Sequence, residues 1–159
     1  MTRTASRAAL LHVAVQDLHA GKRLQAERLP AIADAARDPA LAALLRAEVA
    51  AATAQADRLA ALGDMAGPAN LWMAGILDDA ERDARSHQPG PLLDVALVGA
   101  VRKAKAAEIV SGETALALAR AERLDAFERA VAANGAEERA SDAALKERLE
   151  ALVRARPEA

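Results

Sequence analysis

The sequence has no cysteine and no tyrosine, and its aromatic residues are one tryptophan and one phenylalanine. The lack of cysteine excludes disulfides, thiolate metal sites and cysteine nucleophiles. The near absence of aromatic residues removes the surfaces on which single-stranded nucleic acids stack. Thr, Phe and Ile are rare, whereas Ala, Leu, Glu and Arg are abundant. This composition favours helix over strand, so we expect an all-α fold.

An excess of one charge and long apolar runs are also lacking. The formal net charge is -2, with both signs interspersed, whereas a nucleic-acid interface needs Lys and Arg gathered on one surface. A membrane-spanning helix would need about 18 consecutive apolar residues, and the sequence has no such run. The N-terminus also lacks the small-residue cleavage site of a secretory signal. We therefore expect a soluble, cytoplasmic protein that binds neither nucleic acid nor membrane.

Hydrophobic periodicity and helix breakers predict a single helical domain over residues 1–159. Four long helices are expected at about 4–36, 39–63, 91–120 and 123–153, with a shorter helix at about 70–85. Asp38 followed by Pro39 is typical of the cap and first position of a helix, so the first two helices should form a hairpin. The connection between the second and third long helices is too long for a hairpin. It suits a crossover that carries the short helix along a four-helix bundle.

Charged residues interrupt the apolar seams of three of the long helices. Read at 3.6 residues per turn, the interruptions are Lys22 in the first helix, Lys105 and Glu108 in the third, and Glu138 in the fourth. A rise of about 1.5 Å per residue places each of them near mid-height, about 22 Å from the hairpin turns. Inward carboxylates at mid-height are the arrangement that holds dinuclear iron or manganese in helical bundles.

The histidines that such a metal centre requires are not in the right helices. Three are present, and all lie outside the second, third and fourth long helices: His12, His19 and His87. Lys22 and Lys105 would also place ammonium groups beside the metal ions. A lysine can instead take the place and charge of a metal ion, and compensate Glu108 and Glu138 through charge-assisted hydrogen bonds. The alternative for both lysines is a position on the flank of the bundle, with the ammonium group in water.

Four runs of the sequence together carry a resemblance to a known family. They are DLHAGKRLQAERLPAIA (17–33), DPALAALLRAEVAAATAQADRLAALG (38–63), DVALVGAVRKAKAAEIVSGETALALA (94–119) and AEERASDAALKERL (136–149). Over nearly its full length the chain resembles the bacterial ferritin-like stress-response proteins of the YciE/YciF type. The resemblance implies a ferritin-like bundle with one long crossover, assembled as a homodimer.

The resemblance also implies which positions formerly held metal. The residues that keep the family pattern are Gln55, Glu108, Glu137, Glu138 and Asp142. The residues that depart from it are His19, Lys22, Glu48, Ala51, Ala52, Lys105 and Ala106. Two of these departures put a lysine where the family has a glutamate. The resemblance therefore implies a dinuclear metal site that has been lost.

These observations lead to a specific hypothesis about site and function. A central polar layer is predicted at the former metal site, made of Lys22, Gln55, Lys105, Glu108, Glu138 and Asp142. The predicted protein has no metal cofactor and no catalytic residue, and has a structural or stress-associated binding role. The alternative is an active iron or manganese protein with a reduced, carboxylate-only ligand set: Glu108, Glu137, Glu138 and Asp142.

Two further expectations concern the surface. Glu48 is expected to be half-exposed, with Arg46 or Arg58 nearby. Trp72 is expected to cap the core, and a contact between its segment and a protein partner is the alternative.

Overall fold

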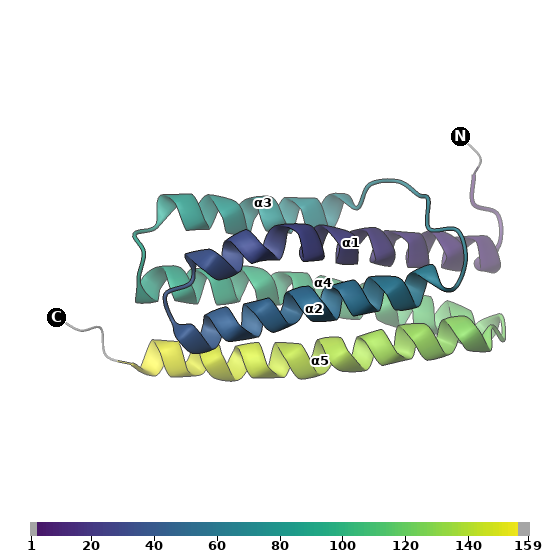
Figure 1. Ribbon diagram of the computed structural model, residues 1–159. Coiled ribbons are helices and arrows are strands. Elements are labelled where there is room, and N and C mark those ends of the chain that lie inside the picture. Colours follow the sequence, from purple (N-terminus) through teal and green to yellow (C-terminus); the bar gives the residue numbers. More distant parts are fainter. Residues whose placement is uncertain (1–2, 156–159) are drawn as a thin grey trace.

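The computed structural model describes residues 3–155, and this part of the chain is all-helical. The helices are α1 (Arg7–Ala35), α2 (Pro39–Ala60), α3 (Leu71–Ser86), α4 (Pro91–Ala121) and α5 (Asp125–Arg154). Figure 1 shows α1, α2, α4 and α5 as a long bundle, with α3 outside it against α1 and α4. Around the bundle, α1 packs on α2, α2 on α5, α5 on α4 and α4 on α1. The predicted all-α four-helix fold with one crossover helix is therefore confirmed.

The helix ends follow from side chains that satisfy free backbone amides. Ser6 accepts a hydrogen bond from the amide of Ala9 (3.1 Å) at the start of α1. Asp38 accepts one from the amide of Leu41 (2.7 Å), and Pro39 occupies the first turn of α2. The short hairpin between α1 and α2 is thus fixed by the dipeptide that predicted it.

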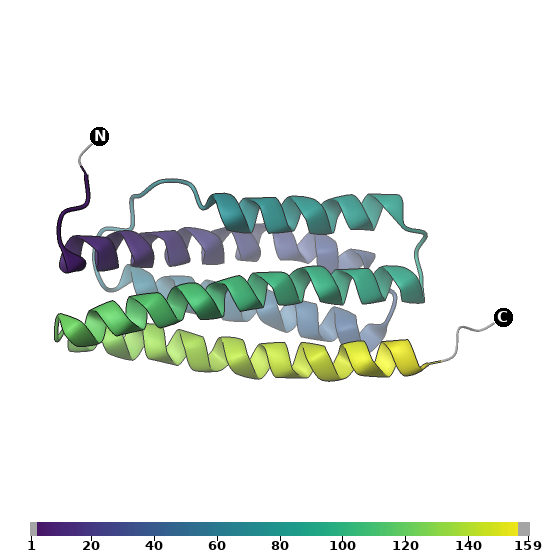
Figure 2. The same ribbon diagram turned by 180° about the vertical axis from the view of Figure 1, so that it is seen from behind.

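The crossover returns the chain to the end of the bundle where α2 began (Figure 2). Gly63 has φ +142°, a backbone conformation that favours glycine. The following loop is held to α1 by Gln16, whose Nε2 donates to the carbonyl of Asp64 (3.2 Å) and to that of Ala66 (2.7 Å). Asn70 then caps α3 by accepting from the amide of Met73 (2.8 Å).

Asp94, near the start of α4, connects this helix to the turn between α1 and α2. Its two carboxylate oxygens accept from the backbone amides of Arg37 (2.8 Å) and Asp38 (3.0 Å). The residue is 2% exposed, so both oxygens depend on these amides for hydrogen bonds. This contact fixes the height of α4 relative to α1 and α2.

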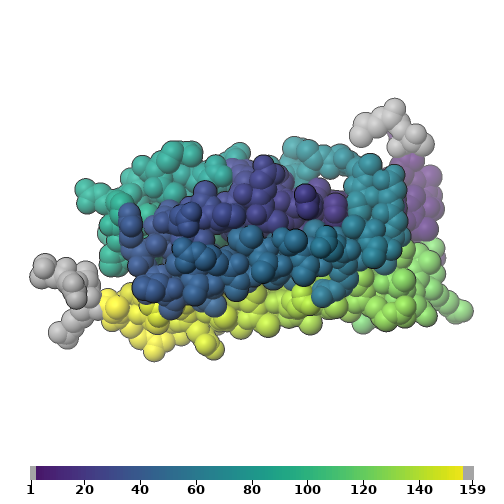
Figure 3. All heavy atoms as spheres, viewed as in Figure 1, coloured from purple at the N-terminus to yellow at the C-terminus, as the bar shows by residue number. Residues whose placement is uncertain are grey.

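The bundle has two apolar cores with a charged region between them. One core includes Leu29, Leu41 and Leu97, and the other includes Leu11 and Leu59. Side chains fill the space between the ribbons, with α2 on the near face above α5 (Figure 3). Among residues 3–155, no helix is long and apolar enough to cross a membrane.

Candidate functional site

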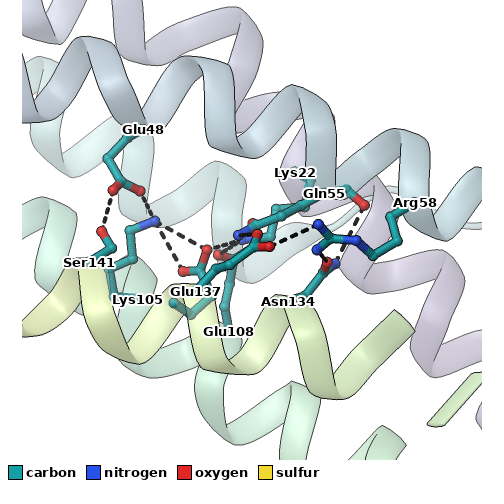
Figure 4. Close-up of polar contacts among 10 residues, drawn as sticks. Lys22, Glu48, Gln55, Arg58, Lys105, Glu108, Asn134, Glu137 and Ser141 are labelled. Atoms are coloured by element: carbon teal, nitrogen blue, oxygen red, sulfur yellow. Dashed lines mark hydrogen bonds and ion pairs between the residues drawn. The ribbon is translucent and has the colours of Figure 1, made fainter. Parts of the chain in front are cut away.

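Lys22 on α1 lies in the interior, with 1% of its surface exposed. Its Nζ pairs with Glu108 of α4 and donates to Glu138 Oε1 of α5 at 2.6 Å. Figure 4 shows the ammonium group pointing between the helices. The flank position for this lysine, the alternative left open by the sequence, is wrong. One ammonium group instead joins three helices of the bundle.

Lys105 on α4 makes a second, similar bridge. It is 1% exposed. Its Nζ pairs with Glu48 of α2 and with Glu138, whose Oε2 and Oε1 lie at 3.0 and 3.3 Å. Glu138 is therefore shared by both lysines. We call Lys22, Lys105, Glu48, Glu108 and Glu138 the lysine–glutamate cluster; it connects all four helices of the bundle.

Glu48 corrects one expectation from the sequence. It is 7% exposed rather than half-exposed, and it pairs with Lys105, not with Arg46 or Arg58. Its other oxygen accepts a hydrogen bond from the hydroxyl of Ser141 on α5. Arg46 is only two residues away, which puts it on another face of the same helix. Glu48 therefore faces the interior of the bundle.

The cluster holds three carboxylates against two ammonium groups, a formal charge of -1 in a buried setting. Burial raises the pKa of Glu108 to about 7. The positive charge of Lys22 lowers this pKa but does not cancel the effect of burial, and the negative charge of Glu138 raises it further. Burial would also raise the pKa of Glu138, but the ammonium groups of Lys22 and Lys105 outweigh it and lower that pKa to about 2. The two glutamates thus differ in their affinity for a proton.

Lys105 stays a cation despite its burial. Desolvation alone would lower its pKa, but the carboxylates of Glu138 and Glu48 outweigh this effect and raise the pKa above its ordinary value. A neutral amine suited to nucleophilic catalysis is therefore disfavoured at this position.

A second polar group borders the cluster on α2 and α5. Gln55 Nε2 donates to Glu137 Oε2 (2.9 Å), and Arg58 donates to Glu137 Oε1 (2.8 Å) and to the side-chain oxygen of Asn134. The hydrogen bond from Arg58 lowers the pKa of Glu137. Gln55 is 1% exposed and so lies in the predicted layer. Glu137 instead faces the partly exposed guanidinium of Arg58.

Asp142 lies apart from the predicted layer. It is half-buried, and its two oxygens accept from Arg102 Nε (2.7 Å) and Nη2 (3.1 Å). The structure thus brings together Lys22, Lys105 and the two predicted glutamates, with Gln55 beside them. It adds Glu48 and Ser141, which the sequence did not assign to the layer, and it separates Asp142.

The carboxylates do not fit a dinuclear metal centre. Glu108 and Glu138 face lysines, Glu137 faces Arg58, and Asp142 faces Arg102. In the described residues, no three His, Asp or Glu side chains lie together in a way that could hold a metal ion. Metal ligands must be free to donate electron pairs, and ammonium groups already hold the inward carboxylates.

Trp72, at the start of α3, is secured within the chain. Its indole N–H donates to Asp17 Oδ2 on α1 (2.8 Å), and its ring packs against the larger core. Its neighbour Leu71 is 81% exposed. The ring therefore caps the core, and the exposed apolar surface of this segment belongs to Leu71.

A long four-helix bundle with one crossover helix and a polar layer at mid-height defines a ferritin-like protein. The chain belongs to a family described as a domain of unknown function (DUF892), whose sequence profile matches residues 6–158. No protein in a search of curated sequences matches it.

Solved structures share the fold. The E. coli stress protein YciF is similar, with a TM-score of 0.92 and 18% identity over 96% of this chain and 100% of that one. A putative structural protein from Rhodopseudomonas palustris, YcfI, has a TM-score of 0.86 and 22% identity over 92% of this chain and 97% of that one. The resemblance to YciF-type proteins drawn from the sequence is confirmed.

Proposed function

We propose that this protein is a ferritin-like bundle in which a buried lysine–glutamate cluster has replaced a dinuclear metal centre. It would then have a structural or stress-associated binding role and no oxidase or iron-storage activity. The observation that carries the proposal is the position of two ammonium groups, those of Lys22 and Lys105, among three buried carboxylates.

The charges explain how such a replacement preserves the fold. Buried carboxylates need a nearby positive charge, because leaving one unpaired in the interior is strongly destabilising. A metal centre supplies that charge through coordination, and an ammonium group supplies it through hydrogen bonds. Lys22 and Lys105 each contact carboxylates from two other helices. They therefore perform the same cross-linking of helices that a bridging metal ion would perform.

Elemental analysis tests the proposal directly. The purified protein is incubated with Fe(II), Mn(II) or Zn(II), desalted, and analysed for metal per chain. We expect less than stoichiometric metal from the wild type. One tightly bound transition metal per chain would overturn the proposal. It would favour the carboxylate-only metalloprotein, especially if Glu138→Ala abolished iron-dependent oxygen consumption.

A matched variant keeps a negative result informative. Lys22→Glu and Lys105→Glu together return carboxylates to the two positions where ammonium groups now stand. We expect this double variant to be unstable without metal and to gain melting temperature when Fe(II) or Mn(II) is added, since binding to the folded state stabilises it. The wild type should show no such gain.

The biological role is proposed by analogy with the similar proteins. One of them is named as a stress protein and the other as a putative structural protein. We propose a stress-associated role in the cytoplasm for this chain. Its abundance should rise when cells meet heat, oxidant or high osmolarity, as measured by quantitative proteomics. Unchanged abundance under all three would contradict the association.

We also propose that the chain forms a homodimer. Large apolar side chains remain exposed on several helices, and they include Leu71 (81%), Leu92 (79%) and Val110 (63%). Exposed apolar side chains favour association where they lie together in one patch, and the family resemblance of the chain carries the proposal of a homodimer. The Leu71–Trp72 segment is the candidate contact for another protein partner. Light scattering after size exclusion should give twice the mass of one chain, and a monomer would contradict the dimer.

A further inference from the structure

A small cavity of about 20 Å³ lies beside the lysine–glutamate cluster. Its polar lining consists of Lys22, Glu108, Asn134 and Glu138. Leu18 and other apolar side chains close the rest of the wall. A cavity needs about 10–15 Å³ to hold a water molecule, and that water needs two to four polar partners. This cavity satisfies the first requirement. Most of its wall is apolar, so the second requirement depends on the few polar atoms beside it.

Glu108 supplies an acceptor without a partner. The residue is 3% exposed, and its Oε2 pairs with Lys22. In the part of the chain that the structure describes, its Oε1 is buried and has no hydrogen-bond partner. A buried carboxylate oxygen left in this way is costly. Its partner is either Glu138, which shares a side-chain hydrogen bond with Glu108 when one of the two carboxyl groups is protonated, or a hydrogen-bond donor small enough for the cavity.

Lys22 supplies a donor in the same wall. An ammonium group has three N–H bonds, and within residues 3–155 the Nζ of Lys22 directs hydrogen bonds to two oxygens, one on Glu108 and one on Glu138. The third N–H remains to donate to an occupant of the cavity. An occupant between Lys22 and Glu108 must therefore both accept and donate.

Two residues of the cavity wall are glycines in helix interiors. Gly112 of α4 and Gly135 of α5 both line the cavity. Apart from proline, glycine is the least favourable residue in a helix interior. A Cβ on Gly112 would meet nothing within 4 Å, and a Cβ on Gly135 would come within 3.3 Å of Arg139 Nη1. Two helices thus contribute no side chain to the cavity wall at these positions.

We propose that this cavity is a binding site for one water molecule, which donates to Glu108 Oε1 and accepts from Lys22 Nζ. A cation is disfavoured because the ammonium group of Lys22 forms part of the same wall, and like charges repel. An apolar occupant would leave Glu108 Oε1 unpaired. The water would complete the hydrogen bonding of the cluster, whether or not the chain ever held metal.

A crystal structure at atomic resolution tests this site. We expect one density peak at hydrogen-bond distance, about 2.7–3.2 Å, from both Glu108 Oε1 and Lys22 Nζ. Crystals grown in a rubidium salt should show no anomalous signal there. An anomalous peak would identify a monovalent cation and overturn the proposal. An empty cavity with Glu108 Oε1 paired to a protein group would also overturn it.

A solution experiment gives an independent answer. NMR cross-peaks between long-lived water and the methyl groups of Leu18 or Val131 are expected, because these residues also line the cavity. Methyl groups of Leu97 in the larger core, which is 0% exposed, serve as the dry control. Glu108→Met should abolish the cross-peaks. If that variant does not fold, the wild-type comparison still decides: equal absence of cross-peaks at both positions would overturn the proposal.

Discussion

Replacing Lys105 by Met tests whether the cluster is a coupled electrostatic unit. Methionine is similar in length to lysine but removes one of the two buried ammonium groups. The three carboxylates of Glu48, Glu108 and Glu138 then face Lys22 alone, and the formal charge changes from -1 to -2. Glu48 is affected most, since its ion pair is with Lys105.

The expected loss of stability is large because the ion pair is buried. Lys105 and Glu48 have side-chain exposures of 1% and 9%, so solvent screens the pair weakly. Removing one partner from a buried pair costs about 3–5 kcal/mol, because the other charge stays buried and uncompensated. Glu48→Gln added to Lys105→Met returns the formal charge to -1. We expect that double variant to recover most of the lost stability.

Urea unfolding followed by circular dichroism measures these differences. Lys103→Met is the matched control, because Lys103 is on the same helix but 63% exposed and pairs with Asp79; it should change stability by less than about 1 kcal/mol. The loss from Lys105→Met should be larger at pH 8 than at pH 5, where protons can neutralise the excess carboxylate. A loss below about 1 kcal/mol, or a double variant no more stable than Lys105→Met, would refute the coupled cluster.

Three further predictions concern buried carboxylates. The folded-state pKa of Glu108 is raised from 4.5 to about 7. Protonated Glu108 therefore stabilises the folded state fully below pH 4.5, and about 3 kcal/mol of that stability should be lost as the pH rises to 7. In Glu108→Gln, the free energy of unfolding measured with urea should not show this difference between pH 5 and pH 7.5. Glu138 has a pKa lowered to about 2, so the stability that its carboxylate contributes should be lost as the pH falls below 4.5. Asp94→Asn should cost about 1–3 kcal/mol, since one of the two backbone amides loses its acceptor; an unchanged thermal melting curve would contradict this role.

The fold was predictable because local signals agree along the whole chain. Asp38 and Pro39 mark a helix start, and the structure begins α2 at Pro39. Alternating spacing of apolar residues identified the seams, so residues that interrupt a seam were expected inside. Lys22 and Lys105, both 1% exposed, follow that rule.

The remaining site residues depended on distances that sequence spacing does not contain. Asp142 lies four residues after Glu138, which rotates it by about 40° around the helix and moves it one turn along it. At that position Asp142 pairs with Arg102 and not with a lysine of the cluster. Glu48 was assigned to arginines on its own helix, but its partners, Lys105 and Ser141, come from α4 and α5. Pairing between helices far apart in sequence was the missing information.

The geometry of the cluster affects which register of the four helices forms more than it affects net stability. A buried ion pair often adds little to stability compared with apolar residues of the same volume, because desolvation offsets the attraction. Sliding α4 by one turn, however, would take Lys105 away from Glu48 and Glu108 away from Lys22. Glu138 would keep Lys22, but Lys105, Glu48 and Glu108 would be buried without these partners. Apolar seams of Leu, Val and Ala tolerate such shifts much better, since these side chains pack in many ways. The cluster therefore selects one register of four helices, a role that explains buried charge between two apolar cores without any metal chemistry.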